Sequence, residues 1–171
     1  IGFEGKVLLS VGHLIERKGN DLIIKALKWL PEVNLAIAGD GVEFTKLNKL
    51  ARKEGVKERV TFLGEIPHEK LRDYYGAADA LVLASSREGW ANVLLESMAC
   101  GTPVIATNIW GTPEVVAVEE AGVLVKRDSW SIAAGVEQLF TNYPDRDMTR
   151  RYAENFSWEA TTSGQLKIFS E

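Results

Sequence analysis

The sequence predicts an α/β fold, a doubly wound parallel sheet of the Rossmann-like kind, with helices on both faces. Three observations indicate this class. Short, almost continuously apolar runs alternate with longer segments of helical periodicity along most of the chain. The runs are apolar on both sides, as expected for strands covered on both faces. Most of them end in a glycine-containing or polar loop, as strands that feed a crossover helix do.

Strands are expected where apolar and β-branched residues cluster, over 6–11, 35–38, 60–63, 80–84, 103–106 and 122–125. Helices are expected where apolar residues recur at helical spacing, over 20–30, 43–54, 67–75, 90–99, 113–117, 130–140, 148–155 and 158–170. Gly55 is a typical C-terminal stop, Pro67 suits the first turn of a helix, and Ser157 is a good N-cap. The last helix has little apolar surface, which would let it dock on something outside this chain.

Composition limits the classes of function. The chain has 171 residues, the size of one domain, and we expect a single unit over 1–171. The net charge of −4 without a basic block argues against a nucleic-acid partner. No apolar run is long enough to cross a membrane, and no signal-peptide pattern is present, so a cytoplasmic location is predicted.

Two further features concern the context of the chain. It opens at Ile1, almost directly on a strand, so we expect an excised domain whose N-terminal partner domain is absent. Peripheral membrane contact, if any, is left to that absent domain. The single cysteine, Cys100, excludes an internal disulfide framework and is expected to be an inert core residue.

The most informative segment places Glu88 and Glu96 eight positions apart, one in a glycine-containing loop and one in the helix that follows. Between them lies the helix N-terminus, whose free backbone N–H groups and positive dipole favour an anion. Two carboxylates that accept hydrogen bonds from hydroxyls, on either side of a phosphate seat, suit a sugar joined to a nucleotide diphosphate. On spacing alone, both acids are also compatible with ordinary solvated positions. The apolar surroundings of Glu96 predict burial, and a buried carboxylate needs partners such as ribose hydroxyls.

Two other loops follow strands at the same predicted edge. The loop over 12–19 contains His13, Arg17 and Lys18 between two glycines, and it could donate to a pyrophosphate. The alternative is a solvated turn with surface cations. The loop over 39–41 is most simply a turn in which glycines supply unusual backbone angles.

Other site types are weakly supported. His68 is expected to be a surface residue, and no cluster has the spacing of metal ligands, so neither a metal nor a cofactor is expected. The glycine signatures of P-loops and of dinucleotide-binding proteins are missing, as is a nucleophile elbow.

Four segments resemble the C-terminal, donor-binding half of a GT-B glycosyltransferase of family 4, a group of retaining enzymes. They are Val-Gly-His-Leu-Ile-Glu-Arg-Lys-Gly at 11–19, Ile-Ala-Gly-Asp-Gly at 37–41, Val-Thr-Phe-Leu-Gly at 60–64, and Ser-Ser-Arg-Glu-Gly-Trp through Thr-Pro-Val-Ile-Ala at 85–106. The resemblance covers nearly the whole chain, and its most specific part is the pair of glutamates separated by seven residues.

The resemblance implies a role for each matching position. Lys18 would contact the donor diphosphate, Glu88 the hydroxyls of the transferred sugar, and Glu96 the ribose. Lys18 and Glu88 would therefore be the catalytic pair. The donor-binding positions that the resemblance implies are Gly12, His13, Arg17, Lys18, Gly39, Gly64, Ile66, Glu88, Gly89, Trp90, Ala91, Asn92, Val93 and Glu96.

Two positions depart from the family pattern. The family usually has arginine where this chain has His13, which is only partly charged near neutral pH. It also commonly has a Gly-Gly pair where this chain has Trp110 and Gly111. Trp110 could line an acceptor site or pack against a partner domain.

The resulting hypothesis is metal-independent transfer of a sugar from a nucleotide-diphosphate sugar, with retention implied by the resemblance. The isolated domain would bind nucleotide weakly and show little transfer. Alternatives are a glycogen-synthase-like glucan synthase, a sugar-phosphate synthase, or a non-catalytic nucleotide-sugar-binding module, to which His13 gives some support. A dehydrogenase is a more distant alternative.

Overall fold

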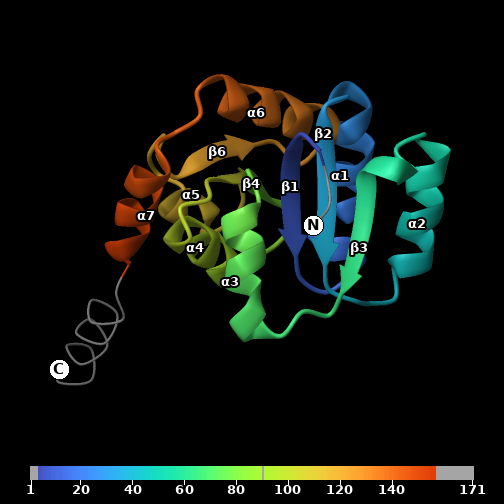
Figure 1. Cartoon of the computed structure of the whole chain (residues 1–171), viewed down its shortest axis with the longest axis horizontal. Coiled ribbons are helices and arrows are strands. Elements are labelled where there is room, and N and C mark those ends of the chain that lie inside the picture. Colours follow the sequence, from blue (N-terminus) through green and yellow to red (C-terminus); the bar gives the residue numbers. More distant parts are fainter. Residues whose placement is uncertain (1–3, 90, 157–171) are drawn as a thin grey trace.

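The computed structural model describes residues 4–89 and 91–156, and it contains one six-stranded parallel sheet (Figure 1). The strands are β1 (Lys6–Val11), β2 (Val33–Ala38), β3 (Val60–Gly64), β4 (Ala80–Leu83), β5 (Val104–Thr107) and β6 (Gly122–Val125). Their order across the sheet is β3-β2-β1-β4-β5-β6. The predicted doubly wound sheet is confirmed, and the strand order reverses between β1 and β4, which is where such sheets bind ligands.

Helices connect the strands. The α-helices are α1 (Asn20–Ala26), α2 (Phe44–Lys53), α3 (His68–Ala77), α4 (Asn92–Ala99), α5 (Thr112–Val115), α6 (Ser129–Thr141) and α7 (Arg146–Glu154). The described residues also form short 3-10 helices, η1 (Glu16–Lys18), η2 (Leu27–Trp29) and η3 (Lys57–Arg59).

The sheet separates two hydrophobic layers. On one face, buried side chains of α1, α2 and α6 pack on alternate strand residues such as Leu8 and Ile37. On the other face, buried side chains of α3, α4 and α7 pack on the intervening residues, such as Leu9 and Ala36. This alternation follows from the two-residue period of a strand, and it buries both faces of the sheet.

Several element boundaries differ from the predicted ones for local reasons. The helix expected over 20–30 is α-helical only to Ala26 and then tightens into the 3-10 turn η2. The strand expected over 35–38 begins at Val33 and is buried along its whole length. Helices α6 and α7 begin earlier than predicted because Asp128 and Asp145 accept hydrogen bonds from the backbone of their first turns. The helix predicted over 158–170, with Ser157 as its cap, lies outside the described residues.

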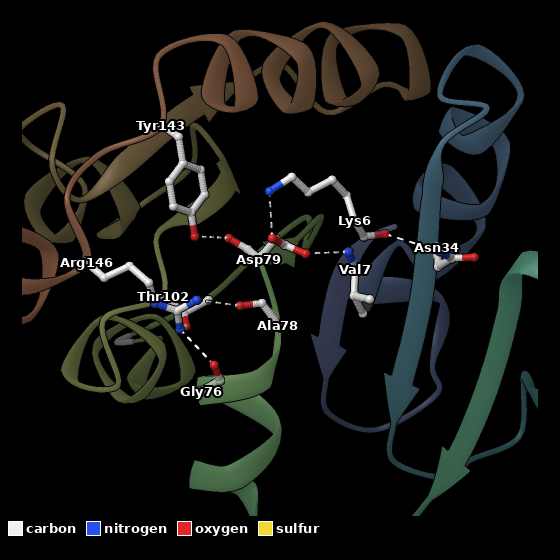
Figure 2. A network of polar contacts seen from close by, with 9 residues as sticks. All are labelled: Lys6, Val7, Asn34, Gly76, Ala78, Asp79, Thr102, Tyr143 and Arg146. Carbon is white, nitrogen blue, oxygen red and sulfur yellow. Dashed lines mark hydrogen bonds and ion pairs between the residues drawn. The ribbon is translucent and has the colours of Figure 1, made fainter. Parts of the chain in front are cut away.

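A polar network joins the amino-terminal edge of the sheet to the segment between α6 and α7 (Figure 2). Asp79 accepts hydrogen bonds from the backbone N–H of Val7 at 2.8 Å and from Lys6 Nζ at 2.9 Å. The Tyr143 hydroxyl donates to the Asp79 carbonyl at 2.7 Å. The network therefore ties the start of β1 and the start of β4 to the segment that leads into α7.

Arg146 supplies the other half of this network. Its guanidinium donates to the carbonyl oxygens of Gly76 at 2.9 Å and Ala78 at 3.1 Å, and to Thr102 Oγ1 at 2.6 Å (Figure 2). The fork of five N–H donors lets one side chain satisfy several acceptors at the end of α3.

We expect Arg146→Ala to lower the free energy of unfolding by about 2–3 kcal/mol, because hydrogen bonds from a charged donor are lost and their acceptors are left unpaired. Urea denaturation measures the change. Arg150→Ala is the matched control: Arg150 forms an exposed pair with Glu154 on the same helix, and its loss should cost at most about 0.5 kcal/mol. Equal costs for the two variants would show that the network adds nothing to stability.

Candidate active site

The centre of the site is an ion pair between Lys18 and Glu88, the two residues that are predicted to be catalytic. Lys18 Nζ lies 2.6 Å from Glu88 Oε1, and their side chains are 16% and 11% exposed. Lys18 closes the loop after β1, and Glu88 lies in the loop after β4. The pair therefore bridges the two strands between which the strand order reverses.

Glu88 is held in its charged form. Burial of its carboxyl raises the pKa, but hydrogen bonds from Lys18 and Ser85 and the charges of Lys18 and Arg17 outweigh burial, so the pKa lies below its usual value. The Ser85 hydroxyl donates to Oε1 at 2.6 Å, the same oxygen that Lys18 contacts. No described residue donates to Oε2, so Glu88 keeps one oxygen that can accept a hydrogen bond from a ligand hydroxyl.

Lys18 likewise keeps donors for a ligand. An ammonium group has three donors, and the hydrogen bond to Glu88 uses one of them. The aliphatic end of Lys18 passes close to Gly12, where an added Cβ would lie 3.4 Å from Lys18 Cε. Lys18 therefore lies between Glu88 and the end of β1.

Arg17 fixes the loop that contains Glu88. Its Nη1 donates to the Arg87 carbonyl at 2.8 Å, and its own carbonyl accepts from Ser86 N–H at 2.9 Å. Gly19 allows this close approach, because a Cβ there would lie 2.2 Å from the Ala84 carbonyl oxygen. The cationic loop predicted over 12–19 is thus docked on the loop after β4, and it is more than a solvated turn.

Helix α4 directs an uncapped N-terminus toward the same region. Its N-cap is Ala91, whose side chain has no oxygen, and no side-chain hydrogen bond caps the helix. The first backbone N–H groups, around Asn92 and Val93, therefore remain available to an anion. Gly89 precedes this turn and is exposed, and Trp90 lies outside the described residues.

An open cavity of about 460 Å³ lies at the carboxyl ends of β1, β2 and β3. Its lining includes four of the predicted donor-binding residues, Gly12, His13, Gly39 and Ile66. Another predicted donor-binding residue, Gly64, contacts this lining: the Gly64 carbonyl accepts a hydrogen bond from Gly39 N–H at 2.7 Å. These five residues lie at the carboxyl ends of β1, β2 and β3 or in the loops that follow, and the parallel order of the strands brings them together.

The backbone conformation at position 39 requires glycine. Its φ is 136°, and a Cβ there would lie 2.0 Å from the Gly12 carbonyl oxygen. The prediction that the loop over 39–41 is a glycine-dependent turn is therefore confirmed. The turn brings the loops after β1 and β2 into contact at the floor of the cavity.

Glu96 was predicted to be buried, and it is partly exposed. Its side chain is 31% exposed, because it lies at the edge of α4 while Leu94, Ser97 and Met98 fill the buried side. Its partners come from α3: the Tyr75 hydroxyl donates to Oε2 at 2.9 Å, and His68 Nε2 lies 3.4 Å from Oε1. Burial and the neighbouring Glu96 charge raise the pKa of Tyr75, which keeps its hydroxyl a donor. His68 is 81% exposed, so its prediction as a surface residue is confirmed.

Two residues that support the site were missed. Ser85 orients Glu88, and Tyr75 orients Glu96. Tyr75 shares an apolar stripe with Leu71 in α3, so its sequence pattern resembles that of a core residue. The Ser85-Ser86 pair directly after an apolar strand was a usable signal, because a polar residue at a strand end commonly faces a site.

Cys100 differs from its prediction. Cys100 is only partly buried, at the end of α4, rather than a fully buried core residue, and burial raises the pKa of its thiol. Within residues 4–89 and 91–156, no group of three or more His, Cys, Asp or Glu side chains could hold a metal ion.

Known proteins resemble this chain over nearly its whole length. The family profile described as "Glycosyl transferases group 1" matches residues 3–156. The chain belongs to the group 1 glycosyltransferases. Among curated relatives, the lipopolysaccharide core biosynthesis glycosyltransferase LpsE of Rhizobium meliloti is 36% identical over 98% of this chain and 50% of its own length. The D-inositol 3-phosphate glycosyltransferase of Mycobacteroides abscessus is 33% identical over 96% of this chain and 39% of its own length.

Solved structures agree on the fold of this group 1 glycosyltransferase chain. The sucrose-phosphate synthase of Thermosynechococcus elongatus superposes with a TM-score of 0.83 at 32% identity, over 98% of this chain and 46% of that one. Anabaena HepE in complex with UDP superposes with a TM-score of 0.85 at 22% identity, over 97% of this chain and 49% of that one. The chain thus spans about half the length of the relatives it matches. None of its described helices is long and apolar enough to cross a membrane.

Proposed function

We propose that this chain is the C-terminal, donor-binding domain of a GT-B glycosyltransferase of family 4. The complete protein would transfer a sugar from a nucleotide-diphosphate sugar to an acceptor. One observation carries the proposal: the Lys18–Glu88 ion pair lies next to an uncapped helix N-terminus at the point where the strand order reverses. Cations, free N–H groups and a carboxylate with one free oxygen are what a diphosphate joined to a sugar requires.

The donor would lie along the carboxyl edge of the sheet. Backbone groups between Gly64 and Ile66 would read the base in the cavity, and Glu96 would accept hydrogen bonds from the ribose hydroxyls. The diphosphate would lie between Lys18 and the first turn of α4. Glu88 would then face the hydroxyls of the transferred sugar with Oε2.

The chemistry follows from where charge develops. The bond between the anomeric carbon and the phosphate oxygen breaks, and negative charge grows on the departing diphosphate. The oxygen of an acceptor hydroxyl bonds to that carbon, and its proton passes to the departing phosphate oxygen or to solvent. Lys18, Arg17 and the N–H groups around Asn92 would stabilise this charge, so the proposal invokes no metal ion. Retention of the anomeric configuration is part of the proposal, and its support is the resemblance of the 85–106 segment to family 4.

The relatives support the wider context. LpsE and the D-inositol 3-phosphate glycosyltransferase are both named as glycosyltransferases, and each is about twice the length of this chain or more. We therefore include in the proposal an N-terminal domain that supplies most of the acceptor contacts, and a cytoplasmic location. The isolated domain would bind nucleotide with little or no transfer.

A second candidate is a non-catalytic nucleotide-sugar-binding module. His13, which lines the cavity in place of the usual arginine, favours it, because the site loses a fixed positive charge. Release of the nucleotide diphosphate from donor sugars by the complete protein would support the enzyme, and donor binding without any release would support the module.

The test of the donor site is a calorimetric titration of the complete protein with UDP, GDP and ADP and their common sugars. We expect one nucleoside diphosphate to bind, and Glu96→Gln to weaken its binding about tenfold, because a charged acceptor of two hydroxyls becomes neutral and loses about 1.5 kcal/mol. Glu137→Gln, which removes an exposed carboxylate from α6, is the charge-matched control and should change the affinity less than twofold. Binding by none of the three nucleotides, or equal effects of the two variants, would contradict the site.

A further inference from the structure

The Glu96 carboxylate has two partners on α3, and they differ in how firmly they hold it. The Tyr75 hydroxyl donates to Oε2 at 2.9 Å, and Tyr75 is only 2% exposed. His68 Nε2 lies 3.4 Å from Oε1, but the His68 side chain is 81% exposed. A hydrogen bond from a buried donor is stronger than one that competes with water, so a ligand displaces the imidazole more easily than the phenol. Oε2 is therefore fixed, and Oε1 is accessible.

Tyr75 is itself held in place through its backbone. The hydroxyl of Thr102, a fully buried residue, donates to the Tyr75 carbonyl at 2.7 Å. The Arg146 guanidinium donates to the same Thr102 oxygen at 2.6 Å. Burial and the Glu96 charge raise the pKa of the Tyr75 hydroxyl, so this group remains a donor near neutral pH. The phenol is therefore a rigid anchor for the carboxylate.

This anchor lies along the wall of the nucleotide cavity. His68, Leu71 and Tyr75 follow one another at spacings of three and four residues, which places them on one side of α3. Leu71 lines the cavity, as do Ile66 and Pro67 directly before the helix. The Glu96 carboxylate contacts the residues on either side of Leu71 along this helix, so it lies beside the cavity.

A fixed carboxylate can distinguish a ribose from a 2′-deoxyribose. A carboxylate has about four acceptor positions, so its two contacts with α3 leave positions on both oxygens. The neighbouring 2′- and 3′-hydroxyls of a ribose are two donors that fill them together. A 2′-deoxyribose has only one of these donors. A carboxylate that cannot turn back to water then keeps an unpaired acceptor, which lowers the affinity.

We propose that Tyr75 is a positioning residue that locks Glu96, and that the locked carboxylate makes the site select ribonucleoside diphosphates over their 2′-deoxy counterparts. The inference rests on the proposed function, in which Glu96 contacts the ribose. Tyr75 touches no ligand in this assignment and acts only through Glu96. The donors that the site selects are therefore ribonucleoside diphosphate sugars, and deoxythymidine diphosphate sugars are disfavoured.

The test is a calorimetric titration of the complete protein with two ligands. They are the nucleotide that binds best among UDP, GDP and ADP, and its 2′-deoxy counterpart. Tyr75→Phe keeps the buried ring and removes only the hydroxyl. Tyr143→Phe is the matched control, because the Tyr143 hydroxyl donates one hydrogen bond, to the Asp79 carbonyl, at the opposite edge of the sheet. Glu96→Gln and the double variant with Tyr75→Phe show whether Tyr75 acts through Glu96.

The wild type is expected to bind the ribonucleotide at least tenfold more tightly than the 2′-deoxynucleotide, because one hydrogen bond to a charged group is lost. Tyr75→Phe should weaken ribonucleotide binding about three- to tenfold, because the freed glutamate must be ordered on binding. Its affinity for the 2′-deoxynucleotide should change less than twofold, since the freed carboxylate can turn to water. The ratio of the two affinities therefore falls, which a merely structural role of Tyr75 would not cause.

The other variants complete the expected pattern. Tyr143→Phe should leave both affinities within twofold of the wild type. The double variant should bind the ribonucleotide within twofold of Glu96→Gln alone.

Four results would overturn the assignment alone. They are a wild-type preference of less than threefold, an unchanged affinity ratio in Tyr75→Phe, additive losses in the double variant, and a Tyr75→Phe protein that does not fold. The last result, seen by circular dichroism, would make the hydroxyl a structural element of the packing between α3 and α4. A wild type that binds none of the three ribonucleotides would instead overturn the proposed function, and the assignment with it.

Discussion

Lys18→Ala in the complete protein is expected to lower the turnover number roughly a hundredfold or more, because removing one donor aimed at developing charge typically costs about 2.7–4 kcal/mol. The ammonium contacts Glu88, three residues before the N-cap of α4, and its remaining donors can bind a phosphate oxygen while it keeps Glu88 charged. Initial rates at saturating donor measure the effect.

The control for this variant is Lys25→Ala. Lys25 forms a pair with Asp21 on α1, so it tests loss of a lysine away from the site, and its rate should change less than twofold. Because Lys18→Ala also leaves the Glu88 carboxylate without its cation, circular dichroism at the assay temperature must show that the variant is folded. A folded Lys18→Ala enzyme with a rate within threefold of the wild type would remove Lys18 from the mechanism.

Glu88→Gln is expected to lower kcat/KM for the donor by about 10- to 150-fold, which corresponds to the roughly 1.5–3 kcal/mol of a hydrogen bond to a charged group. Free nucleoside diphosphate should bind as well as before or more tightly, since the neutral amide releases Lys18 from its ion pair. This selectivity for the sugar distinguishes Glu88 from Glu96, whose replacement should weaken both ligands. Titrations of each variant with the free nucleotide and with its sugar measure the difference.

A double-variant cycle adds a second check on the pair. Lys18 and Glu88 are in direct contact, so the losses in Lys18→Ala and Glu88→Gln should not add in the double variant. Additive losses in kcat/KM would indicate that the two residues act independently. Equal losses of free-nucleotide affinity in Glu88→Gln and Glu96→Gln would contradict the proposal that Glu88 contacts the transferred sugar and Glu96 the ribose.

The sheet was predictable because its signal is local. Each predicted strand is a short apolar run such as 35–38, and the alternation with helices implies parallel pairing. Boundaries such as Ser129 and Arg146 were shifted because single capping aspartates decide where a helix begins, and their side-chain geometry is not contained in periodicity.

The candidate site was predictable where residue type alone carries the chemistry, as for Lys18 and Glu88. The supporting contacts were not, because they join residues far apart in the chain. Tyr75 reaches Glu96 from another helix, and nothing in its spacing separates a donor from a core aromatic. The predicted burial of Glu96 was wrong for a related reason. An apolar helix can leave one edge exposed when its neighbour, here α3, covers it only in part.

The junction between β1 and β4 has a mechanical consequence. These strands share only Leu8 with Ala80 and Leu9 with Leu81 in register, whereas β1 and β2 pair along six residues. An ion pair spans this short junction at each end. Lys6 pairs with Asp79 where the two strands begin, and Lys18 pairs with Glu88 in the loops that follow them. A molecule bound by the loops after both strands at the second end would hold the two halves of the domain together. The stability of the domain would therefore rise with the fraction of sites occupied.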